Sequence, residues 1–334
     1  MIKLVFFLLL SVFTAVCSFG QTVSNVDAYQ EGKNIIITYD TDKAGSVGDV
    51  YCSTDGGRTW GEPLRQVTGD VNKQVPAGSH RIVWDVLAER EKLAGANICF
   101  KVEANSGRFS VNGVSFEMVR VEGGTFRMGA TSEQGSDAEG DKKPVHSVTL
   151  SGYYIGKTEV TQALWKAVMG SNPSSFKGDN LPVECVSWDD CQEFIRKLNT
   201  MTGQNFRLPT EAEWEFACRG GNNSRGYKYS GSNNLGSVAW YDDNSGNKTH
   251  SVATKSPNEL GIYDMSGNVW EWCSDWYGDY SSDAQTNPKG PVSGSGRVYR
   301  GGSWNCYVRG CRSSFRFYDS PTCRYYGLGL RLAL

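Results

Sequence analysis

Two cysteines near the C-terminus, Cys306 and Cys311, have the type and spacing that best suit chemistry. Four residues separate them, and a thiol pair of this kind indicates redox chemistry or a soft metal ion. Other metal-binding patterns are missing from the sequence, which has three widely separated histidines and no Cys-x-x-Cys motif, so ordinary zinc and iron sites are not expected. One histidine, His146, has Glu139 and Asp141 nearby, but we expect a solvated loop there rather than acid–base catalysis.

The sequence leaves disulfide pairing open. Nine cysteines follow the first twenty residues, and an odd number leaves at least one thiol free or intermolecular. An oxidising environment would permit a bridge from Cys306 to Cys311 or to Cys323. Cys52 and Cys99 either form a bridge or are buried as small apolar residues.

The segment around the thiol pair, from Arg300 to Leu334, has an unusual composition. Beyond Trp304 it contains no Lys, Glu, Gln, Met or Trp. Its aromatic residues alternate with arginines, a mixture that is too polar for a typical core and suits a binding surface. We therefore expect a partly exposed surface supported by arginine. Its aromatic residues are Tyr307, Phe315, Phe317, Tyr318, Tyr325 and Tyr326, and its arginines are Arg309, Arg312, Arg316 and Arg324.

The whole chain has 334 residues, which is enough for two domains, and a net charge of −2. Such a charge gives no reason to expect nucleic acid as a partner. Residues 1–20 are predicted to be a signal peptide, with an apolar run over 4–16 and small residues before a cleavage site at Gln21. No later stretch could span a membrane, so we expect an exported protein of the periplasm, cell surface or medium.

Residues 21–106 predict an all-β domain. Turn signals such as Asp55-Gly56-Gly57 separate short runs that favour β-strands. Several short strands at this spacing indicate a β-sandwich of immunoglobulin or fibronectin type. The predicted strands cover 34–39, 50–53, 81–86 and 98–102.

Residues 112–334 predict a second, α+β domain with little regular secondary structure. Three helices are indicated by capping residues, apolar spacing and terminal glycines. Long segments rich in Gly, Asn, Ser and Trp separate and follow them. The predicted helices begin after Thr161 and end at Met169, begin after Ser187 and end near Met201, and begin after Thr210 with Glu213 completing a capping box.

Ordered motifs along residues 115–334 resemble the formylglycine-generating enzyme (sulfatase-modifying factor) domain family. The resemblance implies a C-type-lectin-like α+β fold. In the core of that fold we expect Trp270, Trp272 and Trp276. The motifs are VEGGTFRMG at 121–129, KTEVT at 157–161, PVECVSW at 182–188, RLPTEAEWEFA at 207–217, GIYDMSGNVWEW at 261–272, RGGSW at 300–304 and LGLR at 328–331.

The oxidase members of this family imply one possible chemistry. In them, two cysteines four residues apart bind copper(I), and dioxygen oxidises a cysteine of a protein substrate to formylglycine. The resemblance places Cys306 and Cys311 at the copper ligands, and thiolates are soft ligands that select Cu(I). Ser303 and Trp270 match residues that line that active site. Non-catalytic relatives share the Cys311-Arg-Ser-Ser314 pattern, so Cys306 is the residue that discriminates.

The resemblance also implies a calcium site around a Gly-Asn turn. Its oxygen ligands would be the side chains of Asp264 and Glu271 and the carbonyls of Gly267 and Val269, a hard donor set that suits calcium. The alternative is that the two carboxylates cap or pair locally.

The composition of the tail resembles the variable region of retroelement-diversified proteins, some of which use this domain as a scaffold. Randomised adenines in their asparagine codons yield codons ending in a pyrimidine, which cannot encode the five residue types absent here. The fixed framework would be Arg309, Cys311–Ser314, Arg316, Pro321, Arg324 and Leu328–Arg331. The variable set would be Cys306, Tyr307, Gly310, Phe315, Phe317, Tyr318, Asp319, Cys323, Tyr325, Tyr326 and Gly327.

Three functions follow in order of preference. The first is a binding protein for a protein or other surface ligand, with the second domain as a lectin-like scaffold. The second is a copper-dependent oxidase that matures sulfatases through Cys306 and Cys311. The third is a structural or envelope-assembly role, with the β-sandwich as a spacer. The predicted binding residues are Tyr307, Phe315, Phe317, Tyr318, Asp319, Tyr325 and Tyr326.

Overall fold

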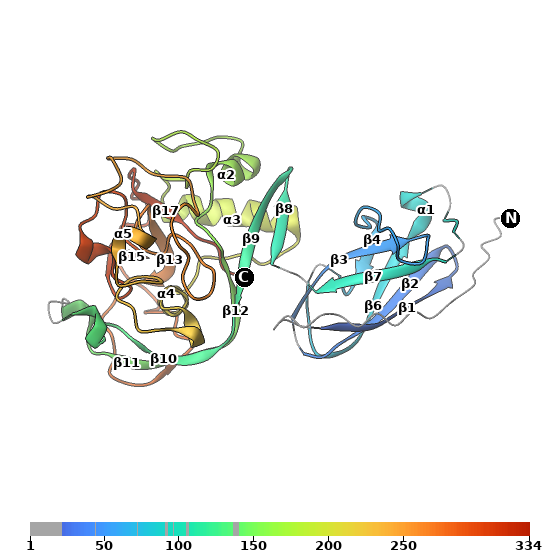
Figure 1. The fold of residues 1–334 in the computed structure, drawn as a ribbon, viewed down its shortest axis with the longest axis horizontal. Coiled ribbons are helices and arrows are strands. Elements are labelled where there is room, and N and C mark those ends of the chain that lie inside the picture. The colour runs from blue at the N-terminus through green and yellow to red at the C-terminus, as the bar shows by residue number, and fades with distance from the viewer. Residues whose placement is uncertain are drawn as a thin grey trace. The chain divides into compact units, whose positions relative to one another are not determined.

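The computed structural model describes residues 22–43, 45–71, 73–90, 93–95, 97–104, 107–135 and 140–334. The predicted signal peptide and Glu139 lie outside these residues. The chain divides into two compact units, residues 1–106 and 107–334, each with its own core (Figure 1). No helix among the described residues has both the length and the apolar character needed to cross a bilayer.

In its described residues, the first unit contains two sheets and one short helix. The sheet orders are β1-β2-β6-β4 and β5-β3-β7, and every pairing within them is antiparallel. The elements are β1 (Val23–Glu31), β2 (Asn34–Thr41), β3 (Gly45–Ser53), β4 (Val67–Gly69), β5 (Lys73–Val75), β6 (Gly78–Asp85), α1 (Val86–Glu89) and β7 (Cys99–Ala104).

One apolar cluster joins the two sheets of this unit. Ile35, Ile37 and Ile82 come from one sheet, and Val50 and Val102 come from the other. Side chains from two facing sheets that share a core are the arrangement of a β-sandwich. The four predicted strands are confirmed, although the last predicted residue of one of them begins α1 instead. The immunoglobulin or fibronectin type stays a prediction.

Cys52 and Cys99 do not form a bridge. In the antiparallel pair β3–β7, Cys52 lies opposite Phe100 and Cys99 lies opposite Ser53. Because successive side chains point to opposite faces of a sheet, the two thiols lie on different faces. Cys52 is buried as a small apolar residue, and Cys99 is partly exposed.

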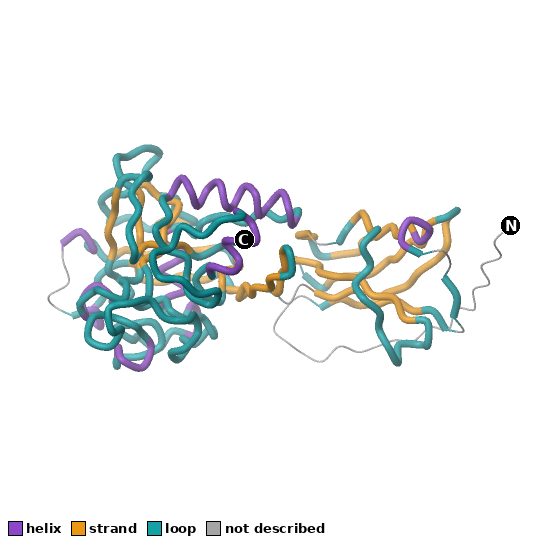
Figure 2. Tube along the Cα trace, turned by 90° about the horizontal axis from the view of Figure 1, so that it is seen from above, coloured by secondary structure: helices purple, strands orange, loops and turns teal. Residues whose placement is uncertain are grey.

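The second unit contains small sheets and long loops, and Figure 2 shows how much of it is loop. Three sheets are present in its described residues, in the orders β12-β9-β8, β10-β11-β14 and β16-β15-β13-β17. The strands are β8 (Arg108–Val111), β9 (Val114–Val121), β10 (Gly124–Met128), β11 (His146–Leu150), β12 (Tyr153–Gly156), β13 (Trp270–Trp276), β14 (Gln285–Thr286), β15 (Arg297–Arg300), β16 (Arg316–Asp319) and β17 (Leu328–Leu330).

All three predicted helices of this unit are confirmed, and their ends follow the capping signals. The side chains of Thr161, Ser187 and Thr210 each accept a backbone N–H of the first turn, and the last two belong to capping boxes. Gly170 and Gly203 end the first two helices in the left-handed conformation. The helices are α2 (Gln162–Met169), α3 (Trp188–Thr202), α4 (Glu211–Cys218) and the short α5 (Leu235–Val238).

The four-stranded sheet and helices α2 and α3 enclose the main core of the second unit. Trp165 of α2 stacks on Phe194 of α3 with ring centroids 4.8 Å apart. Trp270 and Trp272 are buried, as expected. Contrary to expectation, Trp276 is not in the core: it is only partly buried, and the guanidinium of Arg297 lies 3.5 Å from its ring centroid.

Candidate functional site: the C-terminal surface and the thiol pair

The four-stranded sheet positions the C-terminal tail. The central strand β13 pairs antiparallel with β15 and parallel with β17, and β16 forms the outer edge beside β15. The tail therefore enters this sheet twice, at β16 and at β17. The segment between the two strands, residues 320–327, is held at both ends.

Two arginines of the predicted framework anchor the tail below its surface. Arg316 donates from Nε and Nη2 to the two carboxylate oxygens of Glu211, both at 2.7 Å. Arg331 donates from Nε and Nη2 to Glu271 at 2.9 and 2.6 Å. All four side chains are buried. Arg316 therefore supports the tail from a buried bidentate ion pair and is not itself part of the exposed surface.

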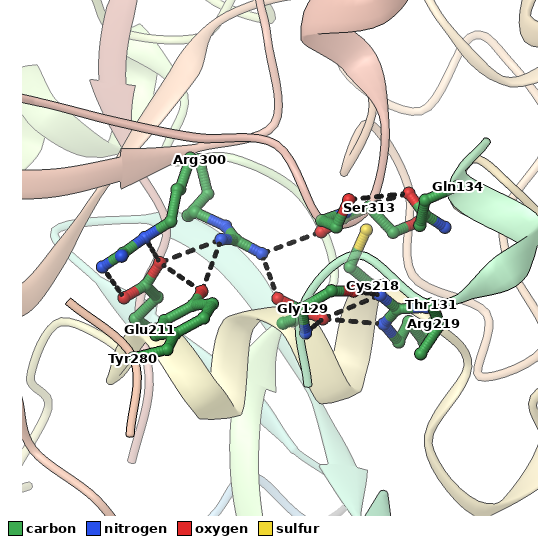
Figure 3. Close-up of polar contacts among 12 residues, drawn as sticks. Gly129, Thr131, Gln134, Glu211, Cys218, Arg219, Tyr280, Arg300 and Ser313 are labelled. Carbon is green, nitrogen blue, oxygen red and sulfur yellow. Dashed lines mark hydrogen bonds and ion pairs between the residues drawn. The ribbon is translucent and has the colours of Figure 1, made fainter. Parts of the chain in front are cut away.

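A third arginine, Arg300, connects this anchor to helix α4 (Figure 3). It donates to Glu211 at 2.9 Å, to Glu215 at 2.5 Å and to the carbonyl of Ser313 at 2.8 Å. Burial favours the neutral form of Glu211. The positive charges of Arg316 and Arg300 outweigh this effect and hold the pKa of Glu211 below its ordinary value. The carboxylate is therefore ionised and counters two buried cations.

The network continues on the other side of Glu215. Arg219 donates to Glu215 at 2.9 Å and to Glu133 at 2.6 Å. Next to it, Gln134 accepts from the backbone and the hydroxyl of Ser314 at 3.2 and 3.0 Å (Figure 3). The tail is thus bonded to a loop 180 residues earlier in the sequence.

Exposure only partly separates the predicted framework from the predicted variable set, in which Cys306, Phe315, Asp319, Cys323 and Tyr325 are partly buried. Framework residues 311, 313, 314, 316 and 328–331 are buried. Arg309 and Arg324 are exposed exceptions, and Gly310 and Gly327 are buried members of the variable set. The strongly exposed variable residues are Tyr307 (73%), Phe317 (51%), Tyr326 (51%) and Tyr318 (44%).

The aromatic residues of the tail contact one another and the sheet. Phe317 packs on Tyr299 of β15, with ring centroids 5.7 Å apart, and Tyr325 packs on the same ring at 6.2 Å. Phe315 is partly buried between Trp270 and the ammonium of Lys142, which lies 4.3 Å from its ring centroid. Phe315, Phe317 and Tyr325 thus contact buried aromatic rings, so this part of the tail is not a fully exposed loop.

The structure brings the four residues of the predicted oxidase site together. The Sγ of Cys306 lies 3.3 Å from the Oγ of Ser303, and Trp270 also hydrogen-bonds to this thiol. Cys306 lies close enough to raise the pKa of the buried Cys311 thiol. Among the described residues every cysteine is free, so neither predicted bridge from Cys306 is present.

Both thiols are held in the protonated form. Burial raises the pKa of Cys306, and it does so despite hydrogen bonds from Ser303 and Trp270 that oppose the shift. Burial, and then the neighbouring Cys306, raise the pKa of Cys311 well above its ordinary value. A Cu(I) ion bound by these thiols would have to displace their protons. Within the described residues no group of three or more His, Cys, Asp or Glu is arranged to hold a metal.

The predicted calcium residues have protein partners in the structure. The two oxygens of Glu271 accept hydrogen bonds from Arg331, and Trp214 donates to the same carboxylate at 2.6 Å. A cation at Glu271 would have to compete with Arg331, so the geometry does not favour calcium there. Asp264 is buried, and burial raises its pKa to about 6.

His146 does not lie in a solvated loop, contrary to our expectation. It begins β11, is buried, and packs against Tyr280 with ring centroids 4.9 Å apart. Its Nδ1 hydrogen-bonds to the carbonyl of Pro144 at 3.1 Å. The nearby Asp141 forms an ion pair with Lys142 at 2.7 Å, so the two residues have separate structural roles.

The resemblance seen in the sequence motifs is matched by comparison with known proteins. Residues 106–334 match the sulfatase-modifying factor enzyme 1-like domain, and this match covers the whole second unit of the chain. The chain belongs to this family. Among the family's curated members, it is 36% identical to "Chaperone protein LppX" of Paenibacillus barcinonensis, covering 70% of this chain and 91% of that protein. It is 31% identical to the formylglycine-generating enzyme of Streptomyces coelicolor, covering 64% and 88%.

Solved structures support the same family and confirm the resemblance to variable proteins. Treponema denticola variable protein 1 aligns with a TM-score of 0.61 and 37% identity, covering 68% of this chain and 97% of that chain. PvdO from Pseudomonas aeruginosa aligns with a TM-score of 0.58 and 25% identity, covering 69% and 98%. The chain is therefore similar both to a formylglycine-generating enzyme and to a variable protein, and membership of the family alone does not decide the activity.

Proposed function

We propose that this chain is an exported ligand-binding protein that displays a variable aromatic surface on a sulfatase-modifying-factor scaffold. The surface is formed by the tail between Asn305 and Gly327. The first unit, as an immunoglobulin- or fibronectin-like sandwich, serves as a spacer. The ligand is a protein or another surface ligand.

The division of the tail by exposure carries this proposal. The framework residues Arg316 and Arg331 are used in buried ion pairs, and 328–330 pair in the sheet, so these positions help to fix the backbone of the tail. Four large aromatic side chains at the variable positions remain exposed instead of entering the core. Tyrosine and phenylalanine give a large contact area with few torsions to restrict, which suits a paratope. The likeness to Treponema denticola variable protein 1 agrees with this use of the fold.

The genomic neighbourhood tests the diversified origin of the surface. We expect an adenine-rich copy of the tail's coding sequence and a reverse transcriptase near the gene, and differences between related strains confined to the variable set. A tail that is identical in independent isolates, with no second copy, would remove this part of the proposal.

A binding experiment tests the surface itself. The chain can be displayed with Tyr307, Phe317, Tyr318 and Tyr326 randomised and selected against two unrelated soluble proteins. We expect folded binders whose affinity disappears when these positions are changed to serine. Matched libraries at four exposed positions outside the tail serve as the control, and equal success with them would argue against a dedicated surface.

A second candidate is a copper-dependent oxidase, favoured by one observation. The Oγ of Ser303 lies 3.3 Å from the Cys306 thiol, which supports a shared site for these two residues. Bound copper would supply dioxygen activation, while the protein's own groups would hold the two thiols and line the site. Stoichiometric Cu(I) binding and turnover of a Cys-x-Pro-x-Arg peptide would establish this function in place of binding.

A further inference from the structure

The strand β16 lies at one edge of the four-stranded sheet of the second unit. In the described part of the chain no strand pairs with the outer side of β16. Phe317 and Tyr318 lie on this strand, and both side chains are about half exposed. An edge strand that is neither covered nor paired offers its backbone groups to another chain.

The hydrogen-bond pattern shows which backbone groups face outward. The carbonyl of Gly296 accepts from the N–H of Tyr277 at 2.8 Å, on the β13 side, so the next N–H, that of Arg297, faces β16. Because the backbone N–H and C=O groups of successive residues point to opposite sides of a strand, those of Tyr299 also face β16. The register places Arg297 opposite Asp319 and Tyr299 opposite Phe317.

Phe317 and Asp319 therefore form the ladder with β15, and the backbone of Tyr318 points away from the sheet. The hydrogen bonds between β13 and β17 lead to the same assignment of which residues face which neighbouring strand. The N–H of Trp270 donates to the carbonyl of Gly327 beside β17 at 2.8 Å, so the next residue of β13, Glu271, faces β15 and its partner Arg300. The N–H and C=O of Tyr318 are thus a donor and an acceptor at the open edge.

Aromatic side chains flank this edge on both faces. Tyr318 stacks on Tyr277 with ring centroids 4.0 Å apart, on the face that carries the buried Arg316. Phe317 packs on Tyr299 on the opposite face. The ring centroids of Phe317 and Tyr318 lie 6.1 Å apart, so a segment along the edge would satisfy the Tyr318 backbone and contact both aromatic residues.

We propose that the open edge of β16 binds an extended peptide segment, which adds to the sheet as a further strand beside Tyr318 and packs against Phe317 and Tyr318. The N–H and C=O of Tyr318 need an acceptor and a donor spaced as in a β-strand, and this requirement identifies the occupant. Main-chain pairing gives affinity and side-chain pockets give specificity in this mode of recognition. The proposal rests on the binding function above and names its partner class, an extended peptide.

A pair of variants separates the backbone from the side chain. The probe is a peptide selected on the full wild-type chain from a displayed random library of about ten residues, a length that spans such a short edge. Tyr318→Ala removes the ring and keeps the N–H, whereas Tyr318→Pro removes both. Proline is tolerated in an edge strand at a position where the backbone nitrogen faces outward, and the preceding residue is already extended.

We expect Tyr318→Pro to weaken peptide binding roughly three- to tenfold beyond Tyr318→Ala, because one main-chain hydrogen bond is lost. Near-ultraviolet circular dichroism checks that both variants are folded. Equal affinities of the two folded variants, or affinities equal to that of the wild type, would overturn the proposal.

A scan of the peptide keeps the proposal testable if the proline variant does not fold. Each peptide amide is methylated in turn, and the affinity for the wild-type chain is measured. Strand addition predicts losses at every second residue, because only alternate amides face the partner strand. Losses without this alternation would overturn the proposal, as would a library that yields no peptide or a wild-type chain that dimerises through this edge and excludes peptides. The broader binding function would still stand if the randomised tail binds folded proteins, and it would fail only if that selection fails as well.

Discussion

Replacing Glu211 with glutamine removes the negative charge between two buried arginines. Glu211 accepts both hydrogen bonds of the Arg316 fork at 2.7 Å and one from Arg300 at 2.9 Å. Glutamine has nearly the same shape, so the change removes the charge and one acceptor and leaves little cavity. Breaking a buried ion pair by removing one partner typically costs about 3–5 kcal/mol, because the other charge stays buried.

We take the lower end, about 3 kcal/mol, because Glu215 still neutralises part of the charge on Arg300. For a domain of this size that corresponds to a fall in melting temperature of roughly 6–12 °C. Thermal unfolding followed by circular dichroism at pH 7 measures it. Glu193→Gln is the matched control, because Glu193 forms a solvent-exposed pair with Arg196, and we expect no measurable change there. A fall in the Glu211 variant as small as that in the control would refute the view that this network holds the tail.

Three further predictions concern titration and metals. Burial and Glu211 raise the pKa of Asp275 to about 7, so its contribution to stability is present below pH 4 and is lost as the pH rises through 7. Across this range the melting temperature should fall more steeply for the wild type than for Asp275→Asn, and equal slopes would contradict it. We expect no stoichiometric Cu(I) binding in competition with a chelator, and Cu(I) binding that Cys306→Ser abolishes would support the oxidase instead. For calcium, Asp264→Asn is a cleaner test than Glu271→Gln, because the latter also breaks the ion pair with Arg331. We expect no rise in melting temperature in millimolar calcium. A rise that Asp264→Asn removes would support the calcium site.

The sequence predicts those parts of the fold that depend on neighbouring residues. The helices follow from local signals, such as Ser187 with a carboxylate three residues later and Gly203 at the end. The strands of the first unit follow from short β-branched runs. Both kinds of signal act within a few residues, so one sequence is enough to detect them.

The sequence could not predict the partners of the tail arginines. Arg316 meets Glu211, 105 residues away, and no local pattern distinguishes it from the exposed Arg324. The signal that was available is the family motif at 207–217, which contains two glutamates that become buried, Glu211 and Glu215. A buried carboxylate requires a cation, so these two residues predict that some arginines are internal, although not which ones.

The sequence indicated which residues belong to the candidate thiol site, but not whether its cysteines are bridged. The family motif places Cys306, Cys311, Ser303 and Trp270, and the structure brings them together. Whether the two cysteines are bridged depends on their geometry and burial, which spacing does not determine. The open edge of β16 was also invisible, because strand order depends on pairings across the whole second unit.

A complete substitution scan of residues 305–331 tests the central claim most directly. Each variant is displayed on cells, and the folded fraction is measured by resistance to protease. The account predicts that Tyr307, Phe317, Tyr318 and Tyr326 accept nearly all residue types, while buried framework positions such as Arg316 and Arg331 accept almost none. Loss of folding at the four aromatic positions as severe as that at the two arginines would show that the aromatic residues belong to the core, and it would contradict a displayed binding surface.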